Sequence, residues 1–272
     1  MSKIALLFAV IFALGSVAPA AASPIDDAVE ARLKGDYPRA LKLLRPLADQ
    51  GDAAAQSNLG FMYATGMGVP QDRAEAAKWY RRAAEQGRAN AQFNLSRMYA
   101  VGQGVPKSEA DALKWFRAAA EQGHAAAQYN LGLMYADGRG IPRDRAEALK
   151  WWRAAAEHGD TPAQYNLGVA YDYGQGLPKN QGEAAKLYRL AADKGHVLAQ
   201  VNLGLLYDQG QGVPQDYVLA YMWFNLAGSF GAQLGNKHRD ALAPRMTSGQ
   251  IAEAQKFSRE WKPVAPGAAQ AQ

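Results

Sequence analysis

The sequence predicts an all-helical repeat solenoid, and three observations predict it. Five residue types recur at a fixed step of 36 positions, each in five copies. Between these markers, apolar residues follow helical spacing and are interrupted by glycine and proline. The composition, 49% hydrophobic and 20% charged over 272 residues, is that of a folded chain. An internal period of this length is typical of stacked helical hairpins, which bury their apolar faces against one another.

The recurring residues place five repeats over residues 53–232. Asparagine, glutamine, tyrosine and proline all keep the step, and leucine marks the positions expected in the core. The five leucines are Leu59, Leu95, Leu131, Leu167 and Leu203. A hairpin of this size cannot bury its own apolar face, so we expect the repeats to be stable only as a stack.

Residues 1–22 are predicted to be a signal peptide that is removed on export. Lys3 precedes an apolar run over residues 4–17, and residues 18–20 read Ala-Pro-Ala, a small-residue cleavage site; cleavage after Ala22 is the alternative. An uncleaved anchor is the competing interpretation, but the run is shorter than the roughly 20 residues that span a bilayer. The sequence therefore predicts a periplasmic or secreted protein with no stable membrane insertion after cleavage.

The third repeat illustrates the first of the two helices expected in each unit. This helix covers residues 125–136, and one face carries Ala127, Leu131 and either Met134 or Tyr135 at helical spacing. We expect this face to pack against the neighbouring helices.

Glycine, proline and aspartate mark the turn to the second helix. Gly132 is expected to let the neighbouring helix approach closely. Gly138 suits the left-handed position just past a helix end, and Pro142 cannot continue the first helix. The second helix should begin after Asp144, which matches a capping box with Glu147 three residues later.

Both ends of the repeat array are predicted to carry capping helices. Residues 23–52 align with a repeat by the same step, with a degenerate first helix. Residues 233–262 contain a short helix over 233–243 and a terminal helix over 248–261. The final segment, 263–272, is small and polar and is predicted to be a disordered tail.

The stretch from residue 127 to 159, AQYNLGLMYADGRGIPRDRAEALKWWRAAAEHG, resembles the SEL-one-like repeat family, a relative of the tetratricopeptide repeats. The resemblance covers five full copies and implies α/α hairpins stacked into a right-handed superhelix. It also implies a role as an adaptor or regulator of protein complexes. The family motif is structural and transfers no catalytic residue. A cysteine-rich branch linked to β-lactam hydrolysis has no counterpart here, because the chain has no cysteine.

The sequence offers no metal or cofactor site. The lack of cysteine excludes disulfides, thiolate metal sites and a cysteine nucleophile. The four histidines are His124, His158, His196 and His238, and they lie in different units of the chain. Since a metal site needs several converging ligands, we expect surface or inter-repeat packing histidines, with no cofactor.

The formal net charge of +5 could indicate a nucleic-acid binder if the charge were clustered. The basic residues instead recur on the second helix together with acidic ones. Glu75 lies three residues before Lys78, and Arg81 lies four residues before Glu85. We therefore expect ion pairs along a solvated face and no nucleic-acid partner.

Some positions of the first helix vary between copies, and they are spaced i, i+3, i+7, so they share one face. This face is predicted to line the concave groove, where solenoids bind their ligands. The candidate partner-binding residues on it are Phe61, Phe93, Arg97, Tyr129, Leu133 and Tyr165. Aromatic and arginine side chains are enriched at binding hot spots. The alternative is that Phe93, Tyr129 and Tyr165 merely pack between repeats.

The predicted function is that of an exported, monomeric, non-enzymatic scaffold. It would bind a protein or peptide in its concave groove, as an adaptor or regulator of an envelope complex or a membrane signalling protein. The alternative is a cell-envelope enzyme acting on cell-wall material, which would need a nucleophile, base or metal at a non-repeating position. The sequence shows none. A purely structural role is a third interpretation.

Overall fold

The computed structural model describes residues 23–264, which fold into fourteen α-helices and one short 3-10 turn, without a strand in this part of the chain. The predicted signal peptide, residues 1–22, and the tail from residue 265 lie outside the described residues. The helices are α1 (Pro24–Leu33), α2 (Tyr37–Asp49), α3 (Ala53–Thr65), α4 (Arg73–Glu85), α5 (Ala89–Val101), α6 (Glu109–Glu121), α7 (Ala125–Asp137), α8 (Arg145–Glu157), α9 (Thr161–Tyr173), α10 (Gln181–Asp193), α11 (Val197–Gln209), α12 (Tyr217–Ser229), α13 (Gln233–Leu242) and α14 (Ser248–Glu260), with the 3-10 turn at Ala243–Arg245.

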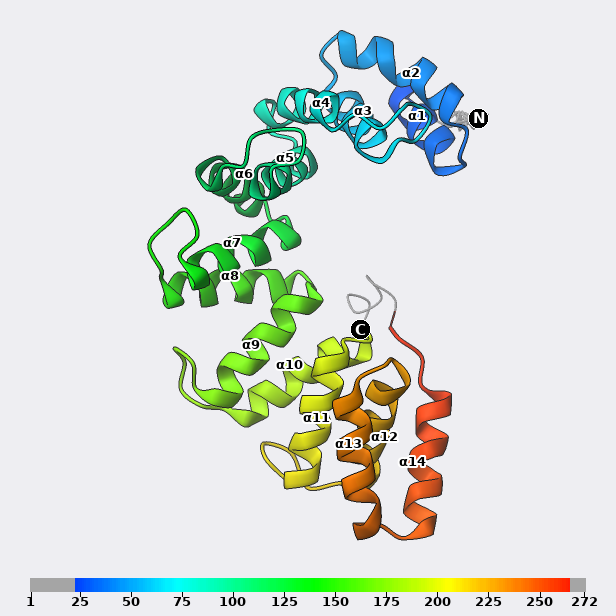
Figure 1. Ribbon diagram of the computed structural model, residues 1–272, viewed down its shortest axis with the longest axis vertical. Coiled ribbons are helices and arrows are strands. Elements are labelled where there is room, and N and C mark those ends of the chain that lie inside the picture. Colours follow the sequence, from blue (N-terminus) through cyan, green and yellow to red (C-terminus); the bar gives the residue numbers. More distant parts are fainter. Residues whose placement is uncertain (1–22, 265–272) are drawn as a thin grey trace, which may run out of the picture.

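From α1 to α13 each helix packs against the next, and the pairs stack into a crescent (Figure 1). In the N-terminal half, α1 contacts α3 and α3 contacts α5, so the first helices of neighbouring repeats lie side by side on the inner side of the curve. The C-terminal end is closed by α13 and α14, which both pack on α12. The all-helical solenoid is confirmed. Within residues 23–264, no helix has the length and apolar character needed to cross a membrane.

The constant positions of the repeat form the core. All five leucines of the 36-residue step are buried. In the third repeat, Ala127 and Leu131 are buried together with Met134, whereas Tyr135 is only partly covered. Met134 is therefore the third member of the packing face.

The constant glutamine joins one repeat to the next. Gln128 is buried, and its side-chain amide donates to the backbone carbonyl of Ala120, 3.1 Å away near the end of the preceding helix α6. The same bond recurs at Gln56, Gln92, Gln164 and Gln200. The last carbonyls of a helix lack partners within it, so this side chain satisfies a group that would otherwise be buried unpaired.

The predicted roles of two glycines are confirmed. A Cβ atom at Gly132 would lie 2.5 Å from the indole ring of Trp152, so the close approach of α8 requires the missing side chain. Gly138 ends α7 with a φ of +75°, the left-handed conformation that glycine adopts without strain.

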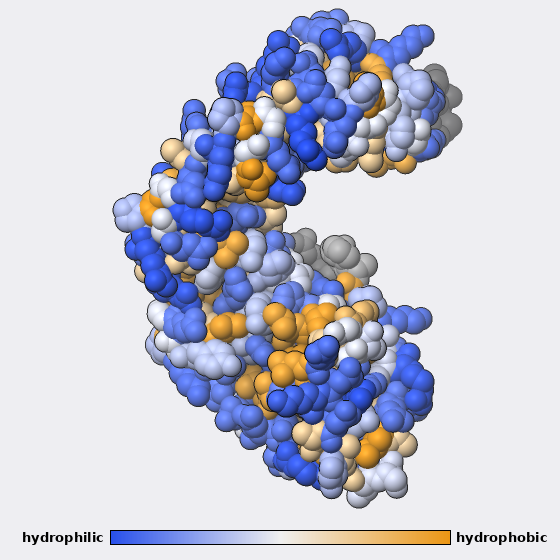
Figure 2. Space-filling model, in the orientation of Figure 1, coloured by the Kyte–Doolittle hydropathy of each residue, from blue (hydrophilic) through white to orange (hydrophobic). Residues whose placement is uncertain are grey.

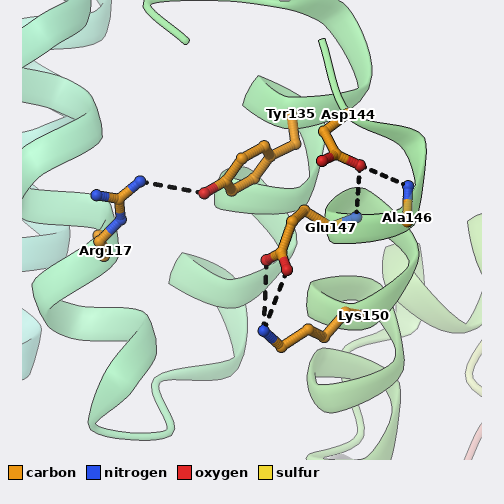
Figure 3. A network of polar contacts seen from close by, with 6 residues as sticks. All are labelled: Arg117, Tyr135, Asp144, Ala146, Glu147 and Lys150. Carbon is orange, nitrogen blue, oxygen red and sulfur yellow. Dashed lines mark hydrogen bonds and ion pairs between the residues drawn. The ribbon is translucent and has the colours of Figure 1, made fainter. Parts of the chain in front are cut away.

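The capping box predicted at Asp144 is only half formed. The Asp144 carboxylate accepts from the backbone N–H groups of Ala146 and Glu147 at 2.9 and 3.0 Å, as an N-cap should (Figure 3). Glu147 does not reach back to the cap, and its carboxylate instead contacts the Lys150 ammonium at 3.2 Å. The cation one turn along the helix is a better partner than a neutral N–H group, because ionic hydrogen bonds are stronger.

The ion pairs predicted on the second helix are partly correct. Lys78 and Glu75 form one at 2.9 Å. The pair predicted between Arg81 and Glu85 is wrong, because Arg81 donates to the Tyr99 hydroxyl of the next repeat at 2.5 Å. Figure 3 shows the equivalent bond from Arg117 to Tyr135, and the same bond joins Arg45 to Tyr63 and Arg189 to Tyr207. The constant tyrosine is thus a link between neighbouring repeats.

Candidate functional site

The six residues predicted to bind a partner all lie on first helices. Phe61 belongs to α3, Phe93 and Arg97 to α5, Tyr129 and Leu133 to α7, and Tyr165 to α9. Arg97 is exposed and the other five are partly buried. Each of these five also packs against a core cluster. The structure therefore gives the aromatic residues a packing contact on one side and leaves part of each side chain accessible.

The packing partners of these aromatic residues include two histidines. The Phe93 ring stacks on His124 with 4.6 Å between centroids, and Tyr165 stacks on His196 at 4.5 Å. Burial lowers the pKa of both histidines and favours the neutral imidazole. In that form Nδ1 can accept from the backbone of the following helix, and it lies 3.3 Å from the Ala127 nitrogen in the first case. The prediction of packing histidines is confirmed for these two.

The two tyrosines are held as neutral phenols. Burial raises the pKa of Tyr129 and that of Tyr165. The side chain of Asn166 counteracts the rise at Tyr129, and Asn202 does so at Tyr165, so each phenol lies beside the constant asparagine of the next repeat. These asparagines are therefore partly covered from the groove side.

A cleft opens where three first helices meet. This α3–α5–α7 cleft has a volume of about 570 Å³ and also takes in residues of α4 and α6 and of the loops that follow α5 and α7. Of the predicted residues, it brings together Phe61 and Arg97 and leaves out the other four. Its apolar floor includes Tyr80, Met98 and Phe116, which are buried. Its amide groups come from Asn94 and Asn130.

The α3–α5–α7 cleft carries an excess of positive charge. Its charged lining residues are Arg73, Arg97, Lys107, Arg139 and Glu109. Arg139 pairs with Asp137 at 3.2 Å. Among the described residues, the other three cations form no ion pair. Burial raises the pKa of the Tyr80 phenol, and the nearby Arg97 opposes this rise.

The equivalent position near the C-terminal end has a different surface. The α9–α11 cleft has a volume of about 200 Å³ and is lined by Asp172, Tyr173, Lys179, Gln181, Asn202, Leu205, Leu206, Gln209 and Gln211. The Asp172 carboxylate accepts from the Gln181 amide at 3.0 Å and from the Tyr188 hydroxyl at 3.3 Å. This cleft is therefore smaller, and its carboxylate is engaged by hydrogen bonds from within the chain.

Sequence reasoning missed most of the α3–α5–α7 cleft. Asn94 and Asn130 keep the 36-residue step, so a search restricted to the variable positions passes over them. Arg73 and Lys107 lie at the start of a second helix and in a loop, where the face they share with Arg97 depends on how the repeats curve. One feature of the sequence pointed to the cleft. No acidic residue lies three or four positions from Arg97, so no ion pair within its own helix is expected for this cation. No group of three or more His, Cys, Asp or Glu side chains in residues 23–264 could hold a metal ion.

The sequence pattern of the Sel1 repeat matches residues 31–52, 53–87, 89–124, 125–160, 161–196 and 197–229. The chain is similar to a Sel1 repeat protein from Oxalobacter formigenes, with 32% identity, 88% of this chain and 100% of that chain covered, and a TM-score of 0.74. An immunity protein from Pseudomonas aeruginosa is 21% identical, with 80% of this chain and 85% of that chain covered and a TM-score of 0.50. A protective antigen from uropathogenic Escherichia coli, with an SLR fold, is 28% identical, with a TM-score of 0.43 over 88% of this chain and 68% of that chain. No curated protein matches the chain.

Proposed function

Because this chain belongs to the Sel1 repeat family and is a Sel1 repeat scaffold, we propose that it binds another protein or a peptide in its concave groove. It does so as an exported monomer, without catalysis and without a nucleic-acid partner. Its role is that of an adaptor or regulator of an envelope complex or a membrane signalling protein.

The observation that carries the proposal is that constant and variable residues lie on different faces of the first helix. Residues that repeat every 36 positions, such as Leu131 and Gln128, are buried and join the repeats. Residues that change, such as Arg97 and Leu133, lie on the other face of the first helices and remain at least partly accessible. Figure 2 shows that the outer rim of the crescent is mostly hydrophilic. A variable, partly apolar inner face on a constant frame is what a recognition surface requires.

The groove is tested by placing a charge on its floor. Leu133→Glu adds a carboxylate to the middle of the groove, and Leu190→Glu adds one to an exposed leucine on α10, a second helix. The full-length protein carrying each change is used as bait on an envelope extract. We expect Leu133→Glu to weaken capture of a specific partner by about tenfold or more, as loss of a hot-spot contact does. Equal behaviour of both variants, or no specific partner, would contradict the proposal.

Export is tested independently of binding. We expect the protein recovered from the envelope fraction to begin after residue 20 or 22, which intact-mass spectrometry would show. Recovery of a form that still begins with Met1 in the membrane pellet would contradict export.

A further inference from the structure

We propose that the α3–α5–α7 cleft binds an acidic peptide segment of the partner, with the carboxylates held by Arg73, Arg97 and Lys107. This inference rests on the proposed function and names the chemistry of the ligand. The cleft contributes three kinds of group that such a segment needs: cations without an ion-pair partner among the described residues, an apolar floor and asparagine side chains with hydrogen-bonding capacity to spare.

The cations are the first argument. Several lysines and arginines elsewhere on the molecule are used internally, as in the Lys78–Glu75 pair or the bond from Arg81 to Tyr99. Arg73, Arg97 and Lys107 have no such ion pair among residues 23–264, yet all three line one cavity. The only carboxylate in that lining is Glu109, at the first position of α6, so positive charge dominates. Positive charge enclosed in a concavity attracts an acidic ligand more strongly than the same charge on an open face.

The floor of the cleft is the second argument. Phe61 reaches it from α3, Met98 from α5 and Phe116 from α6. These side chains form an apolar surface on which one apolar side chain of a peptide can be buried. Burial of apolar area between flanking ionic contacts gives both affinity and register.

The amides are the third argument. The Asn130 side chain donates to the Ala126 carbonyl at 2.7 Å, which leaves its own oxygen available as an acceptor. The side chain of Asn94 has no hydrogen bond among the described residues. An extended peptide presents unpaired N–H and C=O groups along its backbone, and asparagine can bond to both kinds.

The extent of the charge favours a peptide over a nucleic acid or another anionic polymer. A phosphodiester chain is bound by a groove whose positive charge tracks the backbone over many nucleotides. Here the positive charge decreases toward the C-terminal end, since the α9–α11 cleft holds one cation, Lys179, together with Asp172, and has Leu205 where α5 carries Arg97. The exposed cations form a local cluster that suits a short segment with a few carboxylates.

The test begins with a random peptide library displayed on phage and selected on the full-length protein. Selected peptides are then titrated by fluorescence anisotropy against the wild type and three charge reversals: Arg97→Glu, Lys107→Glu and Lys179→Glu. Lys179 is the matched control, because it occupies the position of Lys107 two repeats downstream but lines the α9–α11 cleft. Circular-dichroism melts check that each variant remains folded.

We expect the selected peptides to be acidic. Arg97→Glu and Lys107→Glu should each weaken their binding by about tenfold or more, because each removes an ionic hydrogen bond and adds repulsion. Lys179→Glu should change the affinity less than about twofold, as expected for a charge outside the interface.

Selection of neutral or basic peptides, or acidic peptides insensitive to Arg97→Glu and Lys107→Glu, would overturn the inference while leaving the proposed function in place. A single-stranded oligonucleotide that binds more tightly than the best peptide at the same salt concentration would also overturn it. Failure to select any peptide would count against both proposals.

Discussion

The α3–α5–α7 cleft and the α9–α11 cleft lie at equivalent positions of the repeat and have the same arrangement of helices. They differ in the side chains that line them. In the α9–α11 cleft, Asp172 accepts a hydrogen bond from Tyr188. Three repeats earlier, the corresponding tyrosine is Tyr80, and Ala64 stands where the aspartate would be. The cations Arg73 and Arg97 likewise correspond to Gln181 and Leu205.

The difference between the clefts shows that a few substitutions decide which polar groups of a cleft are engaged within the chain. With alanine at position 64, the Tyr80 side chain faces the α3–α5–α7 cleft without a carboxylate partner from α3. With aspartate at position 172, the α9–α11 cleft satisfies its own tyrosine and glutamine. The next aspartate along, Asp208, is also engaged, by Arg245 at 2.7 Å. The α3–α5–α7 cleft therefore presents three cations without an ion pair among the described residues, whereas Lys179 is the only such cation lining the α9–α11 cleft.

The largest expected effect tests the buried core that supports both clefts. Leu95→Ala and Leu203→Ala remove fully buried side chains from α5 and α11. Each should lower the free energy of unfolding by about 2–5 kcal/mol, measured by urea denaturation, because each leaves a cavity in the core. Tolerance of either change would mean that the two halves are not packed alike.

An effect of intermediate size tests the hydrogen bond that engages Asp172 in the α9–α11 cleft. Asp172→Ala leaves the hydroxyl of the buried Tyr188 without its partner, so it should lower the free energy of unfolding by about 1–3 kcal/mol. Asp172→Asn is the matched control, since it keeps an acceptor oxygen and should recover most of the loss. Equal stability of the alanine variant and the wild type would mean that the bond from Tyr188 to the Asp172 carboxylate does not stabilise this region.

The smallest effect concerns the two packing histidines, which occupy the same position in two repeats. Burial lowers the folded-state pKa of His124 and of His196 below the ordinary value of 6.5, so the folded state prefers the neutral imidazole. Their contribution to stability is therefore complete above pH 6.5 and is lost as the pH falls from there toward the folded-state pKa. We expect the melting temperature to fall over this window.

A double variant isolates this histidine contribution. His124→Asn with His196→Asn should flatten the dependence, because asparagine caps a helix without titrating. Asp160 and Asp193 act at lower pH and with the opposite sign, because burial raises their pKa above 3.8. An unchanged slope in the double variant would contradict the assignment to the two histidines.

The sequence was sufficient for the fold because the fold depends on positions that repeat. Leu131, Gly132 and Gly138 each have one steric role, and each plays it in the structure. Predictions failed where a side chain had two partners within reach. Glu147 pairs with Lys150 rather than with its cap, and Arg81 bonds to Tyr99 of the next repeat rather than to Glu85. Helical spacing identifies neighbours on one helix but not on the next.

The candidate site was predictable only in part for the same reason. The variable face of the first helix indicated Phe61 and Arg97, which line the α3–α5–α7 cleft. It could not indicate Arg73 or Lys107, because they reach the cleft from the loops and from a second helix, and only the stacking of the repeats brings them together. The same variable face also indicated Tyr129 and Tyr165, although both lie outside that cleft.

The most direct test of the account is to locate a bound acidic peptide on the two clefts. A selected peptide carrying a photo-reactive benzophenone is cross-linked to the full-length protein, and the adducts are mapped by mass spectrometry. The account predicts adducts in α3, in α5 and in the loop that contains Lys107. Adducts concentrated instead in α9, in α11 or on the second helices of the repeats would contradict it.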